Sequence, residues 1–455
     1  MATLWVSGLG NDTTGDGTEA LPYRLPSKAL SVASASDTIN VVRDYTYAGT
    51  CLISLNSITI QAVGEGARPL LRNAAGHGIE IADGVTGTVL RSLLSDGNST
   101  HGINLGEGIS GEAIDCVFSN NVSASANGVR TKTAAVGGTF TFRGCVASGN
   151  NNDGFATFGS FIMECWYCVA FGNAGAAASD GFTNHDTSAM RMWFCESYGN
   201  SRGVAFVSDN GAGASWLVGC YIHDSLLPYE FVSSATGGSA AHVNPDYLVG
   251  CAFAPPATDP TGTNIVRFNG VCKGRIWNCT FYNPNVGTVT TQSLDIGSSA
   301  GGRVGWSNCR FVSANDNDAR HIRTSVSPAT QVEFANYNAY DSDTGNKWNV
   351  PASTAFAAWK LLTDFNAVVL DANSTQAADT VGVPFTHKGA FKLPATSALR
   401  GAGTAIDAAI VALGLNYDLF GREITSATPD IGAAQYYFAP GGRIGGGSSM
   451  LLLDG

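Results

Sequence analysis

The amino-acid sequence predicts an all-β protein folded as one elongated, single-stranded parallel β-helix, also called a β-solenoid. Three observations predict it. The composition suits short strands joined by tight turns, cysteines recur in a regular column, and glycines recur in a second column with a similar period. Two independent columns with one period in this range are typical of a solenoid rather than of separate domains.

Composition favours one repetitive core over several globular domains. The chain has 455 residues, 56 of them glycine, and only 13% of its residues are charged, against about 25% in an average globular protein. No charge run or Pro-rich linker divides it. Because a repeat protein extends one core coil by coil, a chain of this length can still form a single domain.

The cysteines recur in similar settings. An apolar residue often stands three positions before the cysteine, Gly, Asn or Asp often directly before it, and Phe or Ile often two positions after it. Side chains two positions apart share one strand face, so the cysteine column is expected to point into the core, with a bend at the Gly or Asn position. The intervals run from 23 to 31 residues between Cys116, Cys145, Cys168, Cys195, Cys220, Cys251, Cys279 and Cys309.

In the second column, each glycine follows a polar residue and precedes an apolar one, at intervals of 22 to 27 residues. The column comprises His77-Gly78-Ile79, His101-Gly102-Ile103, Asn127-Gly128-Val129, Asp153-Gly154-Phe155, Asp180-Gly181-Phe182 and Arg202-Gly203-Val204. We expect the residue before each glycine to lie at the start of a strand and to face solvent.

Both open ends of a solenoid must be covered, because exposed strand edges recruit other chains. Residues 4–6 are expected to form a first strand, and Ser27 is expected to N-cap an amphipathic helix over the first coil. Residues 37–42 then form a strand of that coil. Towards the other end, Ser353 is expected to N-cap a second helix.

The two ends of the chain resemble bacterial and phage right-handed parallel β-helix proteins of the pectate-lyase-like superfamily, over roughly residues 4–438. The resemblance implies the fold and its right-handed winding, and it is compatible with lyases, hydrolases and binding proteins alike. It rests on Trp5-Val6-Ser7, Asn11-Asp12, Gly15-Asp16-Gly17-Thr18, Pro22-Tyr23, Lys28-Ala29-Leu30 and Asp37-Thr38-Ile39 at the start, and on Trp359, Asp364-Phe365-Asn366, Leu393, Ser397, Gly401-Ala402-Gly403, Asp418-Leu419-Phe420-Gly421-Arg422 and Pro429-Asp430-Ile431-Gly432-Ala433 at the end.

Four segments are predicted. Residues 1–50 form the N-terminal cap and first coil, residues 51–350 the β-helix, and residues 351–438 the C-terminal coils and cap. Residues 439–455 are a Gly-rich linker and an apolar tail. We expect residues 441–455 to dock on a partner or a neighbouring copy, with folding back onto the same chain as the alternative.

Charge and hydropathy argue against two classes of partner. The net charge is −11 and no basic stripe is visible, which argues against nucleic-acid binding. No run of 18 apolar residues occurs, so no membrane span is expected, and the N-terminus lacks the pattern of a secretory signal.

The glycine column suggests where chemistry could take place. Asp153 and Asp180 are expected to stack on adjacent coils about 5 Å apart, with Arg202 on the next coil. Two carboxyl groups at this spacing suit acid–base catalysis by a retaining glycosidase, and they could alternatively hold Ca²⁺. The simpler explanation is that aspartate before glycine is ordinary turn chemistry.

Positions two and four after each glycine should point outward on the same face. They bring Arg130, Lys132, His185 and the adjacent Asp186 towards the acid pair. Lyases of the resembled superfamily pair a basic residue with acidic calcium ligands, so Lys132 or His185 could act as base, and Arg130, Arg202 and Asp186 could bind substrate. No stretch matches the catalytic signature of a lyase family, and a solvated face of mixed charge is the plainer alternative.

Two further groups were considered. His223, Glu230, His242 and Asp246 lie in or near residues 223–247, where strand signals are few, and a loop there could form a binding wall through His223 and His242. Several aromatic residues could stack on sugar rings if they are exposed, although most aromatics belong to cores. They are Trp166, Tyr167, Phe171, Trp193, Tyr198 and Tyr221.

Three functions remain. The first is a phage virion appendage, such as a tail spike or fibre, whose β-helix binds host-surface polysaccharide. The second is a polysaccharide lyase or glycoside hydrolase, and the third is a purely structural or adhesive solenoid. The first implies a virion location, attachment to other virion proteins through residues 441–455, and a homo-oligomer, a trimer by analogy with other phage spikes.

Overall fold

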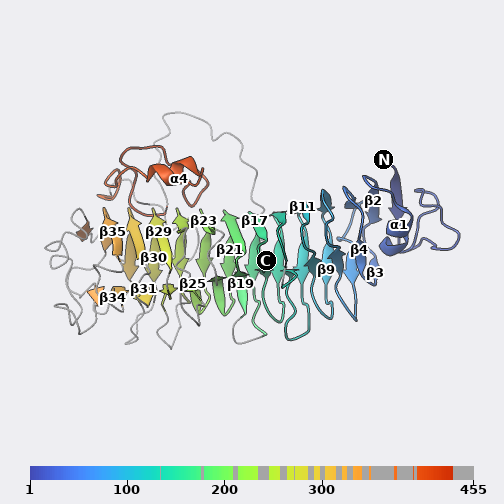
Figure 1. The fold of residues 1–455 in the computed structure, drawn as a ribbon, viewed down its shortest axis with the longest axis horizontal. Coiled ribbons are helices and arrows are strands. Elements are labelled where there is room, and N and C mark those ends of the chain that lie inside the picture. The colour runs from blue at the N-terminus through green and yellow to red at the C-terminus, as the bar shows by residue number, and fades with distance from the viewer. Residues whose placement is uncertain are drawn as a thin grey trace.

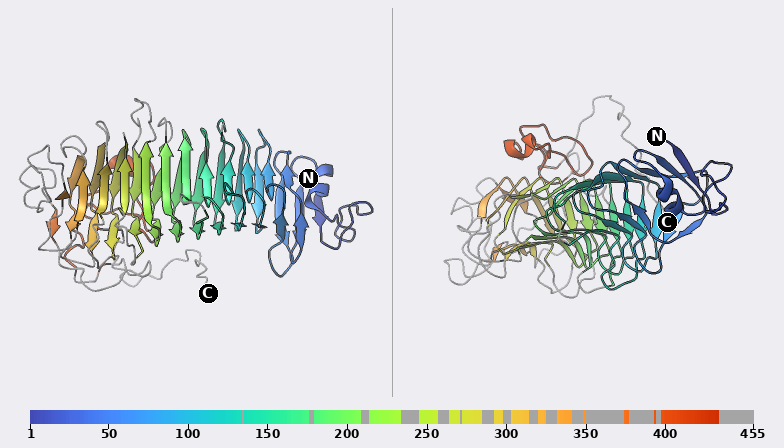
Figure 2. Two further views of the ribbon diagram at one scale, coloured as in Figure 1. Left: turned by 90° about the horizontal axis from the view of Figure 1, so that it is seen from below. Right: turned by 45° about the vertical axis from the view of Figure 1, so that its right-hand side comes forward.

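The computed structural model describes most of the chain. The described residues are 1–133, 135–175, 179–208, 214–233, 245–256, 264–270, 272–284, 292–297, 303–313, 320–324, 332–340, 348–349, 374–376, 393 and 397–433. Within them the chain winds into an elongated solenoid whose coils lie side by side along one axis (Figures 1 and 2). The predicted all-β parallel β-helix is confirmed.

Three parallel sheets, named A, B and C here, form the walls, and the chain visits them in that order in each coil. Sheet A contains β1 (Thr3–Val6), β2 (Thr38–Val42), β5 (Thr59–Val63), β8 (Thr88–Arg91), β11 (Ser110–Ile114), β14 (Thr139–Arg143), β17 (Ile162–Trp166), β20 (Ala189–Trp193), β23 (Trp216–Val218), β26 (Asp246–Val249), β29 (Lys273–Trp277), β32 (Arg303–Ser307) and β35 (Val332–Asn336).

Sheet B contains β3 (Thr46–Ala48), β6 (Leu70–Arg72), β9 (Leu94–Asp96), β12 (Val117–Ser119), β15 (Val146–Ser148), β18 (Val169–Phe171), β21 (Glu196–Tyr198), β24 (Tyr221–His223), β27 (Ala252–Ala254), β30 (Thr280–Asn283), β33 (Arg310–Ser313), β36 (Ala339–Tyr340) and β38 (Thr375–Gln376). Sheet C contains β4 (Cys51–Ile53), β7 (Ile79–Ile81), β10 (Ile103–Leu105), β13 (Val129–Thr131), β16 (Phe155–Thr157), β19 (Asp180–Asp186), β22 (Arg202–Ser208), β25 (Leu227–Ser233), β28 (Val266–Asn269), β31 (Gln292–Gly297), β34 (Arg320–Thr324) and β37 (Trp348–Asn349).

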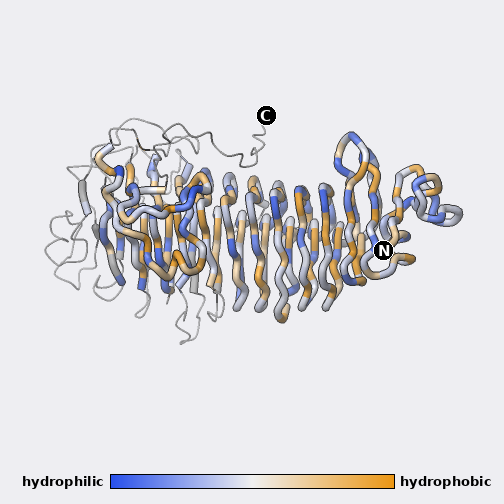
Figure 3. The backbone as a smooth tube through the Cα atoms, turned by 90° about the horizontal axis from the view of Figure 1, so that it is seen from above, coloured by the Kyte–Doolittle hydropathy of each residue, from blue (hydrophilic) through white to orange (hydrophobic). Residues whose placement is uncertain are grey.

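The core fills the space between the sheets. Hydrophobic residues, orange on the backbone tube of Figure 3, recur along successive coils. Most of the side chains that form the core are completely buried. The strands are short, and successive side chains on a strand point to opposite faces of the sheet. Each strand therefore contributes one or two residues to this core.

The corner between sheets A and B explains the cysteine column. The residue before each cysteine of the column has a left-handed backbone, with φ between 52° and 62° for Asp115, Gly144, Tyr167, Phe194, Gly219, Gly250, Asn278 and Asn308. This confirms the predicted bend. Each cysteine then points inward, and all eleven cysteines of the chain are buried and free. Several thiols reach a backbone carbonyl of the preceding coil, as Cys145 Sγ does with Ala113 O at 3.3 Å.

The corner between sheets B and C holds a buried ladder of amides that the sequence analysis missed. Asn98, Asn121, Asn150, Asn173 and Asn200 stack from coil to coil. Each side-chain Nδ2 donates to the Oδ1 of the next residue, at distances of 2.6 to 3.0 Å. Such a ladder satisfies polar groups that would otherwise cost free energy in a dry interior. The repeated Gly-Asn pairs of the sequence were its only signal.

The glycine column begins sheet C, immediately after that corner. A Cβ atom on Gly128 would meet the carbonyl oxygen of Gly154 at 2.8 Å, and one on Gly154 would meet that of Gly181 at 2.6 Å. Only glycine allows the coils to approach so closely. The column therefore reflects packing between coils, as its period suggested.

The N-terminal cap differs slightly from the prediction. Helix α1 (Pro26–Val32) lies beside β1, β2 and β4, but its N-cap is Leu25, without a side-chain hydrogen bond. Ser27 is therefore inside the helix, and its expected capping role was wrong. Pro26 begins the helix because its fixed φ suits the first helical position and its missing N–H costs nothing there.

A C-terminal return segment, residues 397–433, lies along the corner between sheets A and B beside the later coils (Figure 1). It contains helix α4 (Ala408–Ala412), whose N-cap Asp407 accepts a hydrogen bond from Ala409 N. Ile410 and Leu415 pack on Trp216, Tyr247 and Trp277 of sheet A.

The return segment packs against the residues of this corner that have a left-handed backbone conformation. Asn278 Nδ2 donates to Asp430 O at 2.9 Å, and Asn308 exchanges two hydrogen bonds with the backbone of Thr404. A Cβ atom on Gly250 would collide with Tyr417 O. The Gly and Asn preference before the later cysteines therefore serves this docking as well as the bend.

Some predictions lie outside the described residues. They include the helix expected at Ser353, the residue His242 and the tail 441–455. Within the described part of the chain, no helix is long and apolar enough to cross a membrane.

Candidate functional site

The outer face of sheet C carries two rows of polar side chains, which we call together the sheet C strip. The corner row precedes the glycines and consists of His77, His101, Asn127, Asp153, Asp180 and Arg202. The strand row lies on the strands, one residue per coil in direct register. Its members are Glu80, Asn104, Arg130, Ala156, Thr183, Ala205, Glu230, Arg267, Asp295 and Arg323.

The acid pair lies in the corner row, as predicted, but it does not face solvent. Asp153 and Asp180 are on adjacent coils, and Asp180 N donates to Asp153 Oδ1 at 2.9 Å. Their exposed fractions are only 4% and 1%. The expectation of exposure was wrong because the glycines let the coils close tightly here, which presses each carboxyl group against the next coil.

Burial governs the protonation of the pair. Removal from water raises the pKa of Asp153 above its ordinary value, against the lowering effect of the Asp180 N–H and of Arg202 and Arg130. Burial and the neighbouring charge of Asp153 raise the pKa of Asp180, although Arg202 opposes the shift. Two carboxyl groups so placed favour sharing of a proton.

Arg202 anchors Asp180 from the next coil. Its Nε lies 2.5 Å from Asp180 Oδ1 and its Nη2 2.9 Å from Oδ2, which is the forked geometry that arginine offers to carboxylates. Its third nitrogen, Nη1, donates to Glu230 Oε2 at 3.0 Å. One guanidinium thus links two largely buried acids.

The pairing continues towards the C-terminus. Arg267 contacts Glu230 at 3.3 Å and Asp295 at 3.8 Å, and Arg323 contacts Asp295 at 3.8 Å. We call Asp180, Arg202, Glu230, Arg267, Asp295 and Arg323 the paired half of the strip. Acid and base alternate from coil to coil, so every charge of this half lies within 3.8 Å of an opposite charge.

Arg130 is in a different situation. Its guanidinium lies over the Phe158 ring, 4.8 Å from the centroid, and donates to Thr133 Oγ1 at 3.0 Å. Among the described residues it forms no ion pair with a carboxylate. Partial burial lowers the pKa of Arg130, although nearby Asp153 opposes this. Arginine remains charged under such conditions, so Arg130 presents a half-buried cation without a direct counter-ion.

Other polar atoms around Arg130 are also unpaired. His77 and His101 stack at 5.1 Å, and each uses Nδ1 within the protein, for Thr100 Oγ1 and Asn127 N respectively. No described residue hydrogen-bonds their Nε2 atoms or the side chains of Glu80 and Asn104. We call His77, Glu80, His101, Asn104 and Arg130 the open half of the strip.

Burial keeps the imidazoles of this face neutral. It lowers the pKa of His101 to about 3, with Arg130 and His77 adding to the shift, and it lowers the pKa of His77. It also lowers the pKa of His185 to about 4. A neutral imidazole can donate or accept at its second nitrogen, as sugar hydroxyl groups require.

The remaining predicted residues of this face are only partly brought together. His185 stacks on Phe158 at 4.5 Å and lies 3.3 Å from Thr183 Oγ1, so it shares with Arg130 the ring of Phe158. Lys132 instead pairs with Asp83, at 2.7 and 2.8 Å. Asp186 accepts from Gly159 N at 3.1 Å at the end of β19. The predicted base Lys132 is thus held by another carboxylate.

The second predicted group does not converge on one loop. His223 lies on sheet B, Glu230 on sheet C, and Asp246 inside the solenoid with an exposed fraction of 2%. The expected loop over residues 223–247 is replaced by strand at residues 227–233, which form β25, and at residue 246, which begins β26. Residues 234–244 lie outside the described residues.

His223 is held by two carboxylates. Its Nδ1 lies 2.7 Å from Asp224 Oδ2 and its Nε2 2.9 Å from Glu196 Oε1. Burial disfavours its charge, yet these two hydrogen bonds outweigh burial and raise the pKa of His223. Tyr198 and Tyr221 stack on the ring at 5.1 and 4.1 Å. With both nitrogens occupied, His223 has little left to offer a substrate.

The aromatic residues considered for sugar stacking stack on one another instead. Trp166 and Trp193 lie 4.1 Å apart and nearly parallel, and so do Phe171 and Tyr198 at 5.1 Å. Arg143 lies over Trp166, 5.3 Å from the ring centroid. Tyr167 stacks on Phe194 at 5.2 Å and is 55% exposed. Stacking between coils thus takes up a ring face of each of these residues.

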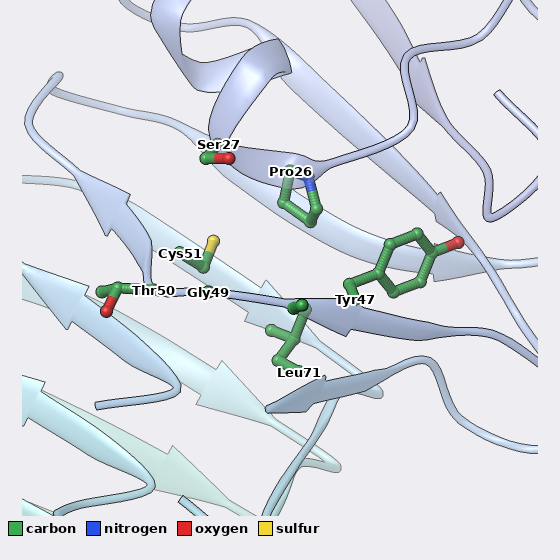
Figure 4. Close-up of a pocket in the computed structure, with 8 residues that line it drawn as sticks. Pro26, Ser27, Tyr47, Gly49, Thr50, Cys51 and Leu71 are labelled. Carbon is green, nitrogen blue, oxygen red and sulfur yellow. The ribbon is translucent and has the colours of Figure 1, made fainter. Parts of the chain in front are cut away.

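Two other sites were considered. Within the described residues no three His, Cys, Asp or Glu side chains come together as metal ligands. At the acid pair Arg202 already supplies the positive charge that calcium would bring. A small pocket lies under α1, lined by Pro26, Ser27, Tyr47, Ala48, Gly49, Thr50, Cys51 and Leu71 (Figure 4). It encloses about 160 Å³, part of it open to solvent, and holds no charged side chain.

Comparison with known proteins gives no family. No family model matches the chain, and no curated protein matches it. Solved structures with similarity include pectate lyase Pel9A, with 13% identity over 96% of this chain and 97% of that one, and a TM-score of 0.43.

XylC in complex with xylose has 9% identity, covering 76% and 86% of the two chains, with a TM-score of 0.47. The A-module of the Azotobacter vinelandii mannuronan C-5 epimerase AlgE4 has 12% identity, covering 76% and 99%, with a TM-score of 0.36. The identification of the chain as a parallel β-helix rests on its own three sheets.

Proposed function

We propose that the protein binds a carboxylated polysaccharide on the open half of the sheet C strip. One observation carries the proposal. Arg130 is a half-buried cation without a carboxylate partner among the described residues, whereas Arg202, Arg267 and Arg323 of the same strip all have one. A strip that pairs these three arginines leaves Arg130 for an external anion.

The surroundings of Arg130 suit a sugar acid. The Phe158 ring beneath its guanidinium holds the group flat, and a planar guanidinium binds carboxylates through two parallel hydrogen bonds. The free atoms of His101 and Asn104 on the preceding coil can exchange hydrogen bonds with hydroxyl groups. Binding would then combine one strong charged contact with several weaker neutral ones.

We propose binding rather than cleavage for this strip. A general acid must come within hydrogen-bond reach of the leaving oxygen, but Asp153 and Asp180 are almost fully buried and Asp180 is held by Arg202. The carboxyl groups of Asp153 and Asp180 therefore stabilise the neighbouring arginines instead of contacting a substrate. A catalytic role for the pair is tested by Asp153→Asn and Asp180→Asn, which would abolish glycan cleavage if it exists.

The binding proposal is tested with paired arginine variants. Wild-type protein is screened on an array of acidic and neutral glycans, and affinities for the best acidic ligand are measured by calorimetry. Arg130→Ala should weaken binding at least about tenfold, as expected for loss of a charged hydrogen bond. Arg323→Ala, a matched variant in the paired half, should bind like wild type. Equal losses in both variants, or no glycan bound at all, would refute the proposal.

The setting of this function is a further part of the proposal. The resemblance at both ends of the chain is to proteins common in phages, so we propose a tail spike or fibre that binds host-surface polysaccharide. Residues 441–455 would attach it to other virion proteins. Mass spectrometry of purified particles tests the location, and deletion of residues 441–455 should remove the protein from them. Particles that keep the truncated protein would contradict the attachment.

A further inference from the structure

The open half of the strip has opposite charges at its two ends, two coils apart. Arg130 on β13, Asn104 on β10 and Glu80 on β7 are direct neighbours in one row. Like Arg130, Glu80 forms no ion pair among the described residues. Between the two charges lie only neutral groups, namely Asn104 and the stacked imidazoles of His101 and His77.

The repeat of the strip matches the repeat of an extended glycan. Neighbouring coils are about 4.8 Å apart, and the stacked rings of His77 and His101 are 5.1 Å apart. This is close to the length of one sugar unit in an extended chain. A polysaccharide lying along the solenoid axis would therefore place successive units over β13, β10 and β7.

From this charge order we infer that the bound polysaccharide carries one acidic unit next to at least two neutral units, and is not a uniform polymer of acidic sugars. The inference rests on the proposed function and names its substrate class. An acidic unit over β13 meets Arg130. A neutral unit over β10 meets His101 and Asn104. A second acidic unit over β7 would meet the Glu80 carboxylate at short range.

The physical reason is repulsion between like charges. A carboxylate placed against Glu80 has no nearby cation to offset it, because Arg130 is two coils away and Lys132 is held by Asp83. Arrangements of this kind reject wrong partners more than they strengthen right ones. A neutral sugar over β7 can instead donate its hydroxyl hydrogens to Glu80 and exchange bonds with His77 Nε2.

Three trisaccharides test the inference by calorimetry. They are glucuronosyl-xylobiose with one acidic end unit, trigalacturonate with three acidic units, and maltotriose with none. The wild type should bind glucuronosyl-xylobiose most tightly. Glu80→Gln should raise the affinity for trigalacturonate about fivefold, since one like-charge contact is removed, and should not raise the affinity for the other two.

Two controls separate the possible outcomes. Glu112→Gln, a matched change on the outer face of sheet A, should alter none of the three affinities. Arg130→Gln should weaken both acidic ligands and spare maltotriose. If the wild type prefers trigalacturonate and Glu80→Gln changes nothing, the inference fails while the proposed function stands. If Arg130→Gln has no effect on either acidic ligand, the proposed function fails with it.

Discussion

The two halves of the sheet C strip lie on different coils of the same sheet and use their charges differently. In the paired half every arginine contacts an acid, and Arg202 alone links Asp180 to Glu230. In the open half Arg130 and Glu80 are two coils apart with neutral side chains between them. One parallel sheet thus carries a series of paired charges in one place and two unpaired charges in the other.

The difference between the two halves shows that the register between strands determines which charged side chains become neighbours. Along each row neighbouring side chains are spaced by the coil repeat, so the order of residues in the row decides which charges meet. Glu230, Arg267, Asp295 and Arg323 alternate and neutralise one another. Ala156, Thr183 and Ala205 separate Arg130 from this series. Three small residues therefore keep Arg130 available.

The strongest test of the comparison is removal of one arginine from each half. Arg202→Ala leaves Asp180 and Glu230 without their cation in a buried setting, so we expect a loss of about 3–5 kcal/mol in the free energy of unfolding. Arg130→Ala should cost about 1 kcal/mol or less, since it forms no direct ion pair with a described carboxylate. Urea denaturation measures both. Similar losses in the two variants would show that the halves are not different.

A second test uses a buried aspartate that forms no ion pair with an arginine among the described residues. Asp246 lies inside the solenoid, where Ser215 N donates to its Oδ1 at 2.8 Å and Oδ2 has no partner among the described residues. Burial raises the pKa of Asp246 to about 8, against the lowering effect of the Ser215 hydrogen bond. The fold therefore favours the neutral acid, and this stability is lost as the pH rises from about 4 through about 8.

Asp246→Asn should remove that dependence. The amide oxygen can still accept from Ser215 N, and no charge needs burial, so at pH 9 the variant should be more stable than wild type by on the order of 3 kcal/mol. The two proteins should converge near pH 4. Thermal unfolding across pH 4–9 measures the difference, and parallel curves for the two proteins would contradict it.

The third test converts part of the open half into a paired one. Asn104 is the direct neighbour of Arg130, and Asn104→Asp would give Arg130 a carboxylate partner. Affinity for a carboxylated glycan should fall about tenfold, because the ligand must displace the new partner. Ser148→Asp on the outer face of sheet B is the matched control, and an equal effect there would point to net charge alone.

The smallest effect is expected at the far end of the paired half. Arg323 contacts Asp295 at 3.8 Å and its side chain is 47% exposed, against 21% for Arg202. Solvent screens such a contact, so Arg323→Ala should cost about 0.5 kcal/mol or less. A loss close to that of Arg202→Ala would mean that pairing, rather than burial, sets the scale along this half.

Much of the fold was readable from the sequence, for reasons that lie in local geometry. The cysteine and glycine columns revealed the solenoid because both corners need particular residues, a left-handed one before Cys116 and its equivalents, and a glycine where Gly128 faces Gly154. The asparagine ladder was equally regular but was overlooked. Asparagine is common in turns, so its spacing did not stand out.

The candidate site was only half predictable. Adjacency of Asp153, Asp180 and Arg202 followed from the period, and the structure confirms it. Burial of the acid pair did not follow, because exposure depends on how closely neighbouring coils approach. The capture of Lys132 by Asp83, 49 residues earlier, was likewise out of reach of a one-coil pattern.

By itself the sequence determined the solenoid, its period and the rows in which side chains would stand, because these depend on local backbone preferences repeated from coil to coil. Only the tertiary structure decided which charges are paired, which carboxyl groups are buried, and where residues 397–433 lie along the corner. Those outcomes depend on contacts between coils and between distant segments, whose free energies are set by burial and by the distances between partners rather than by any short stretch of chain.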